Sequence, residues 1–88
     1  MPFDEHIPAD VQAVLDTAAV LQVTEFQVFS MSYATWFGNT PGDKLIEPYF
    51  VRYMFDEIVP YWVRWFTRAV MERYRQGSLD PKELGIEQ

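Results

Sequence analysis

The sequence contains no cysteine, and its 88 residues include a single histidine, His6. Without cysteine the chain has no disulfides, thiolate metal sites, iron–sulfur clusters or cysteine nucleophiles. His6 follows Asp4 and Glu5 in the N-terminal segment, but no second histidine stands at helical spacing to complete a metal site. We therefore expect no metal and no cofactor.

Motifs that would indicate catalysis are also missing. The chain has no Gly-x-Ser-x-Gly, no glycine-rich phosphate loop and no Glu-x-x-His pair for a di-metal site. We expect that the protein is not an enzyme. No stretch resembles a membrane span of ~20 apolar residues, and the acidic start Met-Pro-Phe-Asp-Glu-His does not resemble a signal peptide. These features favour a cytoplasmic location.

Charge is unevenly distributed along the chain, which carries a net charge of −6. Residues 1–51 contain seven acids and one base, whereas residues 52–88 contain six of each. The first half would repel a phosphate backbone, so we expect no binding to nucleic acid. Five of the seven bases are arginine, and arginine, aromatic residues and methionine are typical of interface cores. The alternative is a small core that simply uses large side chains.

Aromatic residues make up 17% of the chain. Its three Trp, five Tyr and seven Phe carry about 3,000 Å² of side-chain surface at ~200 Å² each. That is about a third of the ~9,700 Å² that a chain of this mass hides on folding, and the other apolar residues compete for the same interior. We therefore expect some aromatic side chains to remain exposed as a patch that association would cover.

Helical periodicity begins with residues 8–22. Pro8 suits the first position of a helix, where its missing N–H is no loss. At ~100° per residue the apolar side chains fall on one side and the polar side chains on the other. A first helix is predicted over this range.

The second helix is predicted from its two ends. Thr24 and Gln27 match a capping box, which places the helix start at Glu25, and Gly38 as the C′ residue places its end at Phe37. One continuous helix is the alternative, because no glycine or proline separates this segment from the first. Five aromatic residues share one arc of the second helix, and we expect them to build the core: Phe26, Phe29, Tyr33, Trp36 and Phe37.

The next segment, residues 38–76, contains three prolines. After a loop at 38–43, Asp43 is expected to cap a short turn, and Pro48 to start a third helix. The pattern is then helical as far as Gln76, with one interruption at Pro60. Proline removes a helical hydrogen bond, but no turn-forming residue flanks this one. We predict a kinked pair of helices around Pro60 rather than a loop.

No segment alternates with a period of two, so no strand is predicted. The fold class is all-α, a compact bundle of four to five helices with short connections. Residues 1–88 are expected to form one helical domain, with an N-terminal tail at 1–7. A short turn and tail at 78–88 would begin with Asp80 as cap and Pro81 as the first helical residue.

Glu57 is a candidate for a functional carboxylate. Its angular position on the third helix places it near Ile46, Phe50 and Tyr53, and burial there would raise its pKa unless an arginine compensated. We expect a carboxylate paired with an arginine or a tyrosine hydroxyl. A catalytic acid is the alternative.

The most distinctive constellation lies in the fourth predicted helix, residues 61–76. Arginines form one stripe along it, and aromatic and aliphatic residues cover roughly the opposite half. The arginine stripe could face solvent, form the edge of a partner interface, or rest on lipid headgroups. We assign the helix to partner binding through Tyr61, Trp62, Arg64, Trp65, Arg68 and Arg75.

The predicted function is that of a small acidic helical protein-binding module or accessory subunit. Its partners are expected to be another protein, a further copy of the same chain in a homo-oligomer, or both. One alternative is a peripheral membrane-surface protein that uses the amphipathic helix at 61–76. The other is a ligand-binding or enzymatic bundle centred on Glu57.

Overall fold

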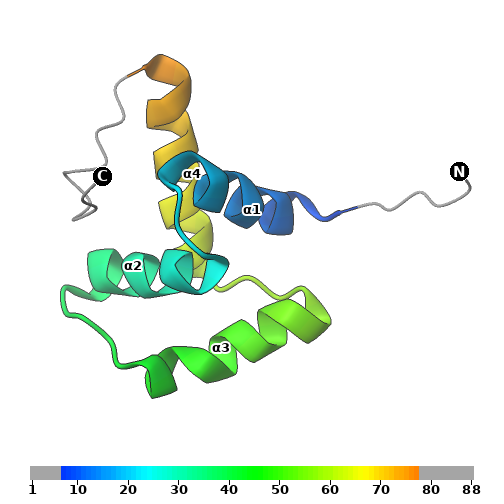
Figure 1. Cartoon of the computed structure of the whole chain (residues 1–88), viewed down its shortest axis with the longest axis vertical. Helices are drawn as coiled ribbons and strands as arrows, with labels where there is room; N and C mark the ends of the chain where they lie inside the picture. Colours follow the sequence, from blue (N-terminus) through cyan, green and yellow to red (C-terminus); the bar gives the residue numbers. More distant parts are fainter. Residues whose placement is uncertain (1–6, 78–88) are drawn as a thin grey trace, which may run out of the picture.

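The computed structural model describes residues 7–77, and this part of the chain forms four α helices and no strand. The all-helical fold class is thereby confirmed. The features predicted at residues 1–6 and 78–88, including His6 and the turn at Asp80 and Pro81, lie outside the described residues. The helices, in chain order in Figure 1, are α1 (Ala9–Leu21), α2 (Glu25–Phe37), α3 (Asp43–Asp56) and α4 (Tyr61–Gln76).

Helix α2 has the two ends that the sequence predicts. The Oγ1 atom of Thr24 accepts a hydrogen bond from the Gln27 N–H (3.1 Å), and the Thr24 N–H donates to the Gln27 side chain (2.8 Å). At the other end Gly38 takes a left-handed conformation at φ 83° and donates its N–H to the Ala34 carbonyl. A left-handed Gln22 ends α1, so α1 and α2 are separate helices.

Helix α3 begins five residues earlier than expected. Gly42 is its N-cap, and Pro48 lies inside the helix instead of starting it. A proline at this point removes a single N–H, and Pro48 lies on the exposed side, where water can bind the carbonyl that loses its partner. The prediction of a start at Pro48 was therefore wrong.

The helix pair expected around Pro60 is present, but residues 57–60 between α3 and α4 are not helical. Glu57 adopts φ 58°, and the next N–H, that of Ile58, bonds back to the Arg52 carbonyl (3.4 Å). This C-cap ends α3 before the proline is reached. Pro60 is the N-cap of α4, where its carbonyl accepts the N–H of Arg64 at 3.0 Å. The change of direction is thus a four-residue connection and not a kink.

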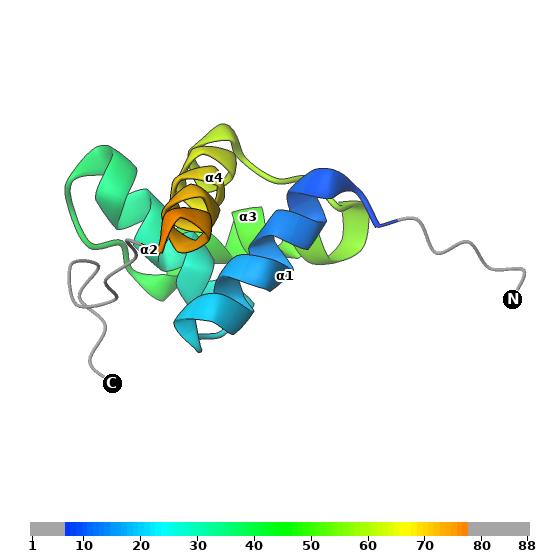
Figure 2. The same ribbon diagram turned by 90° about the horizontal axis from the view of Figure 1, so that it is seen from above.

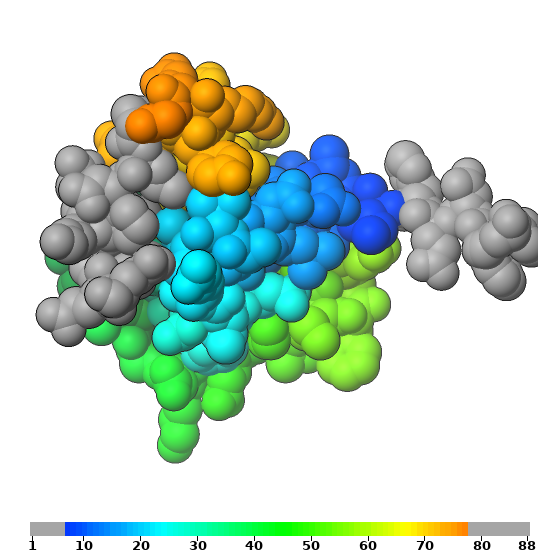
Figure 3. Space-filling model, turned by 45° about the horizontal axis from the view of Figure 1, so that its top comes forward, coloured from blue at the N-terminus to red at the C-terminus, as the bar shows by residue number. Residues whose placement is uncertain are grey.

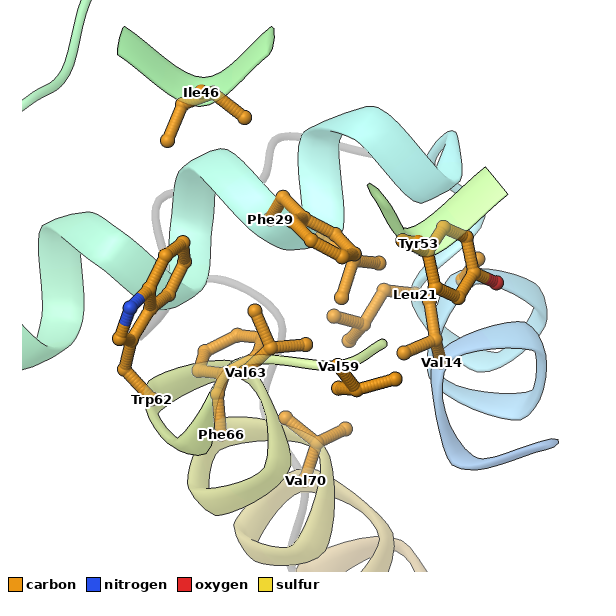
Figure 4. Packing of buried hydrophobic residues seen from close by; sticks show 12 residues of the cluster. Val14, Leu21, Phe29, Ile46, Tyr53, Val59, Trp62, Val63, Phe66 and Val70 are labelled. Atoms are coloured by element: carbon orange, nitrogen blue, oxygen red, sulfur yellow. The ribbon is translucent and has the colours of Figure 1, made fainter. Parts of the chain in front are cut away.

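Helix α4 is the centre of the packing. Figures 1 and 2 show α1 and α2 crossing it, while α3 packs mainly on α2 at the edge of the molecule. All four helices supply side chains to the core, and in Figure 4 the rings of Phe29 and Phe66 point into the space between α2 and α4. The buried hydrophobic cluster contains Val14, Ala18, Leu21, Val28, Phe29, Ile46, Tyr53, Val59, Trp62, Val63, Phe66 and Val70.

Candidate functional site

Four of the six predicted partner-binding residues lie together on α4. Tyr61, Arg64, Trp65 and Arg68 follow one another at spacings of three, one and three residues, so they project from one side of the helix. They line an open hollow of about 480 Å³ together with Ala69 of α4 and Trp36 of α2. A single stretch of sequence thus supplies most of the hollow.

Three aromatic rings form the apolar part of this hollow. The indole of Trp36 contacts Tyr61 at 5.4 Å and Trp65 at 5.2 Å between ring centroids, in both cases close to edge-to-face. The contacts hold the rings in a fixed arrangement. Yet each of the three residues is between 43 and 53% exposed, so the cluster presents apolar surface to solvent. The expectation that aromatic side chains remain uncovered is confirmed here.

Trp36 is the residue of this site that the sequence analysis missed. It was assigned to the core arc of α2, but Trp36 and Phe37 are both exposed, while Phe29 is fully buried. Phe26 and Tyr33 are partly buried and pack against the core. The last turn of α2 lies against the start of α4, where Phe37 contacts the ring of Trp62, yet Trp36 and Phe37 both remain exposed. Their position at the helix end was the signal in the sequence.

Trp62 does not belong to the surface to which it was assigned. It is only 3% exposed, and its indole lies in the core in Figure 4. Rings from α2 and α3 surround it, with Phe29, Tyr33 and Tyr49 at centroid distances of 6.1, 5.5 and 5.3 Å. The assignment of Trp62 to partner binding is corrected accordingly, because the position after Tyr61 turns inward between α2 and α3.

The arginines of α4 differ in their surroundings. Arg64 forms an ion pair with Asp10 of α1 at 3.9 Å, and both side chains are over 40% exposed. Such a pair contributes less than about 1 kcal/mol. Arg68 and Arg75 are exposed and form no ion pair with any residue in the described range.

A second hollow, of about 440 Å³, runs between α1 and α4. Arg68 lines it as well as the aromatic hollow, so the two adjoin along α4. Arg75 lines only this second hollow, where Glu72 and Asp16 supply carboxylates. Arg75 therefore lies apart from the aromatic cluster, whose lining contains two guanidinium groups and no acid.

Glu57 lacks the environment that the sequence predicted. It is exposed, and it occupies the left-handed cap position of α3 instead of a site against the core. A partly buried polar pair instead joins Tyr53 of this helix to α2, with the Tyr53 hydroxyl donating to Glu25 Oε1 at 2.6 Å. Burial raises the pKa of Tyr53 above its usual value, and the Glu25 carboxylate raises it further.

Residues 7–77 contain neither a metal-binding cluster nor a membrane-spanning helix. No group of three or more histidine, aspartate or glutamate side chains lies close enough there to hold a metal ion. Nor is any helix in this range both long and apolar enough to cross a bilayer.

Comparison of the chain with protein-family models, curated protein sequences and solved structures finds no match.

Proposed function

We propose that the protein is a small helical protein-binding module, or accessory subunit, whose contact surface is the hollow lined by Trp36, Tyr61, Arg64, Trp65 and Arg68. The observation that carries this proposal is the cluster of three half-exposed aromatic rings, in which Trp36 contacts both Tyr61 and Trp65, with two arginines at its border. Tryptophan, tyrosine and arginine are the residues that most often dominate binding energy at protein interfaces.

The charge of the hollow favours an acidic partner. The chain has a net charge of −6, yet this hollow is lined by arginines and by no carboxylate. A segment with aspartate or glutamate beside an apolar side chain would match it, because guanidinium groups bind carboxylates in a two-point geometry. We therefore propose a partner that presents such a segment.

The packing of α4 supports a protein partner over a lipid surface. The apolar half of α4, with Trp62, Val63, Phe66 and Val70, is buried in the core. An interfacial membrane helix needs that face free to enter the bilayer. The part of α4 that remains exposed is the aromatic and arginine side.

Charge reversal in the hollow tests this function. The double variant Arg64→Glu, Arg68→Glu should weaken binding to an acidic, apolar peptide by at least about thirtyfold, the effect expected when interface anchors are lost. Peptides of that type would be selected from a display library on the native protein, and affinity measured by calorimetry. The matched control is Arg73→Glu, Arg75→Glu, which changes the net charge equally but lies outside the hollow.

Trp65→Ala provides a test without any change of charge. It should weaken the same binding and leave the free energy of unfolding within about 1 kcal/mol of the native value, because the side chain is half-exposed. Unaltered affinity in both the Trp65 variant and the charge-reversed variant would refute the proposed surface.

A further inference from the structure

Helix α3 carries a second apolar surface, on the side that faces away from the core. Val51, Met54 and Phe55 follow one another at spacings of three residues and one, which places them on one side of α3, and the exposed Ile58 follows in the connection just after the helix. Phe55 is 81% exposed and the other three are 49–57% exposed. The opposite side of α3 is buried, with Tyr53 inside the core.

The position of α3 leaves this apolar face open. The helix packs mainly on α2, and Figure 1 shows it at the edge of the molecule. In the space-filling view of Figure 3 the end of α3, in light green, forms an outer edge that no other described element covers. At ~150–200 Å² for a large side chain in full exposure, the four residues leave roughly 400 Å² uncovered.

We propose that this face binds a second copy of the same chain, with the two α3 helices antiparallel about a two-fold axis. A stable interface buries ~800 Å² on each partner, so the four apolar residues supply about half of what is needed. Exposed flanking residues of α3, including Glu47, Pro48 and Arg52, would supply the remainder. The interface is separate from the aromatic hollow on α4 and does not depend on the function proposed for it.

The charges on α3 match this two-fold arrangement. Lys44 lies near the start of the helix, whereas Asp56 and Glu57 lie at its end. With Val51 on the axis of an antiparallel pair, Lys44 of one copy lies level with the end of α3 of the other, where Asp56 and Glu57 supply acids. The symmetry repeats this pairing of opposite charges. Helix α3 itself has three acids and two bases, so its net charge of −1 opposes contact little.

The first experiment determines the oligomeric state by sedimentation velocity and light scattering over a series from micromolar to submillimolar protein. The native chain should form a dimer of twice 10.4 kDa. Phe55→Glu should raise the dissociation constant at least about thirtyfold, because it places a charge in the centre of an apolar interface. Gln12→Glu is the matched control, since it adds the same charge at an exposed position of α1 and should leave the dimer intact.

A charge exchange tests the antiparallel arrangement. Lys44→Glu alone should weaken the dimer, since it places an acid beside Glu57 of the second copy. Lys44→Glu combined with Glu57→Lys restores opposite charges across the interface and should recover most of the affinity. A double variant no tighter than the single one would overturn the antiparallel arrangement.

A cysteine placed on the proposed axis locates the contact directly, because the native chain has none. Val51→Cys should form a disulfide-linked dimer under mild oxidation faster than Gln12→Cys, and equal rates would contradict the proposal.

A native chain that stays monomeric at every concentration also overturns the proposal of a dimer. If Phe55→Glu then lowers the free energy of unfolding, a terminal segment of the same chain covers α3. A dimer lost in Trp65→Ala but kept in Phe55→Glu would place self-association on the α4 hollow instead.

Discussion

Thr17 and Thr67 are buried threonines that differ in the hydrogen bonding of their hydroxyl groups. Thr17 is fully buried on α1, and its hydroxyl has no hydrogen-bond partner among the described residues. Thr67, on α4, is equally buried, but its hydroxyl donates to the Arg64 carbonyl at 3.1 Å. Burial without a partner costs the desolvation of the hydroxyl, whereas burial with one is largely compensated. The same residue type therefore has different energetic consequences on two neighbouring helices.

At this scale we predict that Thr17→Val stabilises the protein. Valine preserves the shape of the side chain and removes the unpartnered hydroxyl, so the free energy of unfolding should rise by about 1 kcal/mol. Urea denaturation followed by circular dichroism measures the change. Thr67→Val is the matched control and should bring no gain, because it deletes a hydroxyl that has a partner. Equal effects of the two substitutions would contradict this account.

Helix α2 is defined by interactions within a few residues of each end. The capping box binds two N–H groups at its start, and the left-handed Gly38 closes its end. Because the two residues of the box lie only three positions apart, the helix start can be predicted from the local sequence. Helix α3 has a weaker start, since Gly42 provides no side-chain cap. Its start is therefore less evident from the residues around it.

For this element we predict that Thr24→Ala lowers the free energy of unfolding by about 1 kcal/mol, the usual cost of losing an N-cap. Thr35→Ala is the control on the same helix. Thr35 is exposed and its hydroxyl donates only to the Met31 carbonyl one turn earlier. Alanine has the higher helix propensity, so this variant should be neutral or slightly stabilising. Urea denaturation of both variants distinguishes the cap from the loss of any threonine.

For the molecule as a whole, Tyr53 connects the peripheral helix α3 to the rest of the fold. Its ring contacts Phe29 of α2 at 5.1 Å, and its hydroxyl donates to Glu25. Loss of the proton would leave a buried phenolate beside a carboxylate, which is why the pKa of Tyr53 is raised. The stabilisation is complete below the pKa of an unfolded tyrosine, about 10, and is lost as the pH rises toward the folded value.

We predict that the free energy of unfolding of the native protein falls as the pH rises above about 10, and that Tyr53→Phe makes this fall less steep. Near neutral pH the variant should be less stable by about 1.5 kcal/mol, because the hydrogen bond to a charged group is gone. Urea denaturation at a series of pH values tests both statements. Tyr74→Phe, which removes an exposed phenol, should retain the slope of the native chain. A Tyr53 variant with the native slope would contradict the assignment.

The helical class and the ends of α2 could be predicted from the residues alone, because both depend on side chains three to five positions apart. The sequence also predicted that the aromatic surface exceeds what so short a chain can bury. Periodicity could not specify how each helix is rotated against its neighbours. Trp62 and Trp65 lie one turn apart on α4, yet one fills the core and the other lies at the surface beside Trp36. Contacts between distant segments specify which rings are covered and which remain exposed.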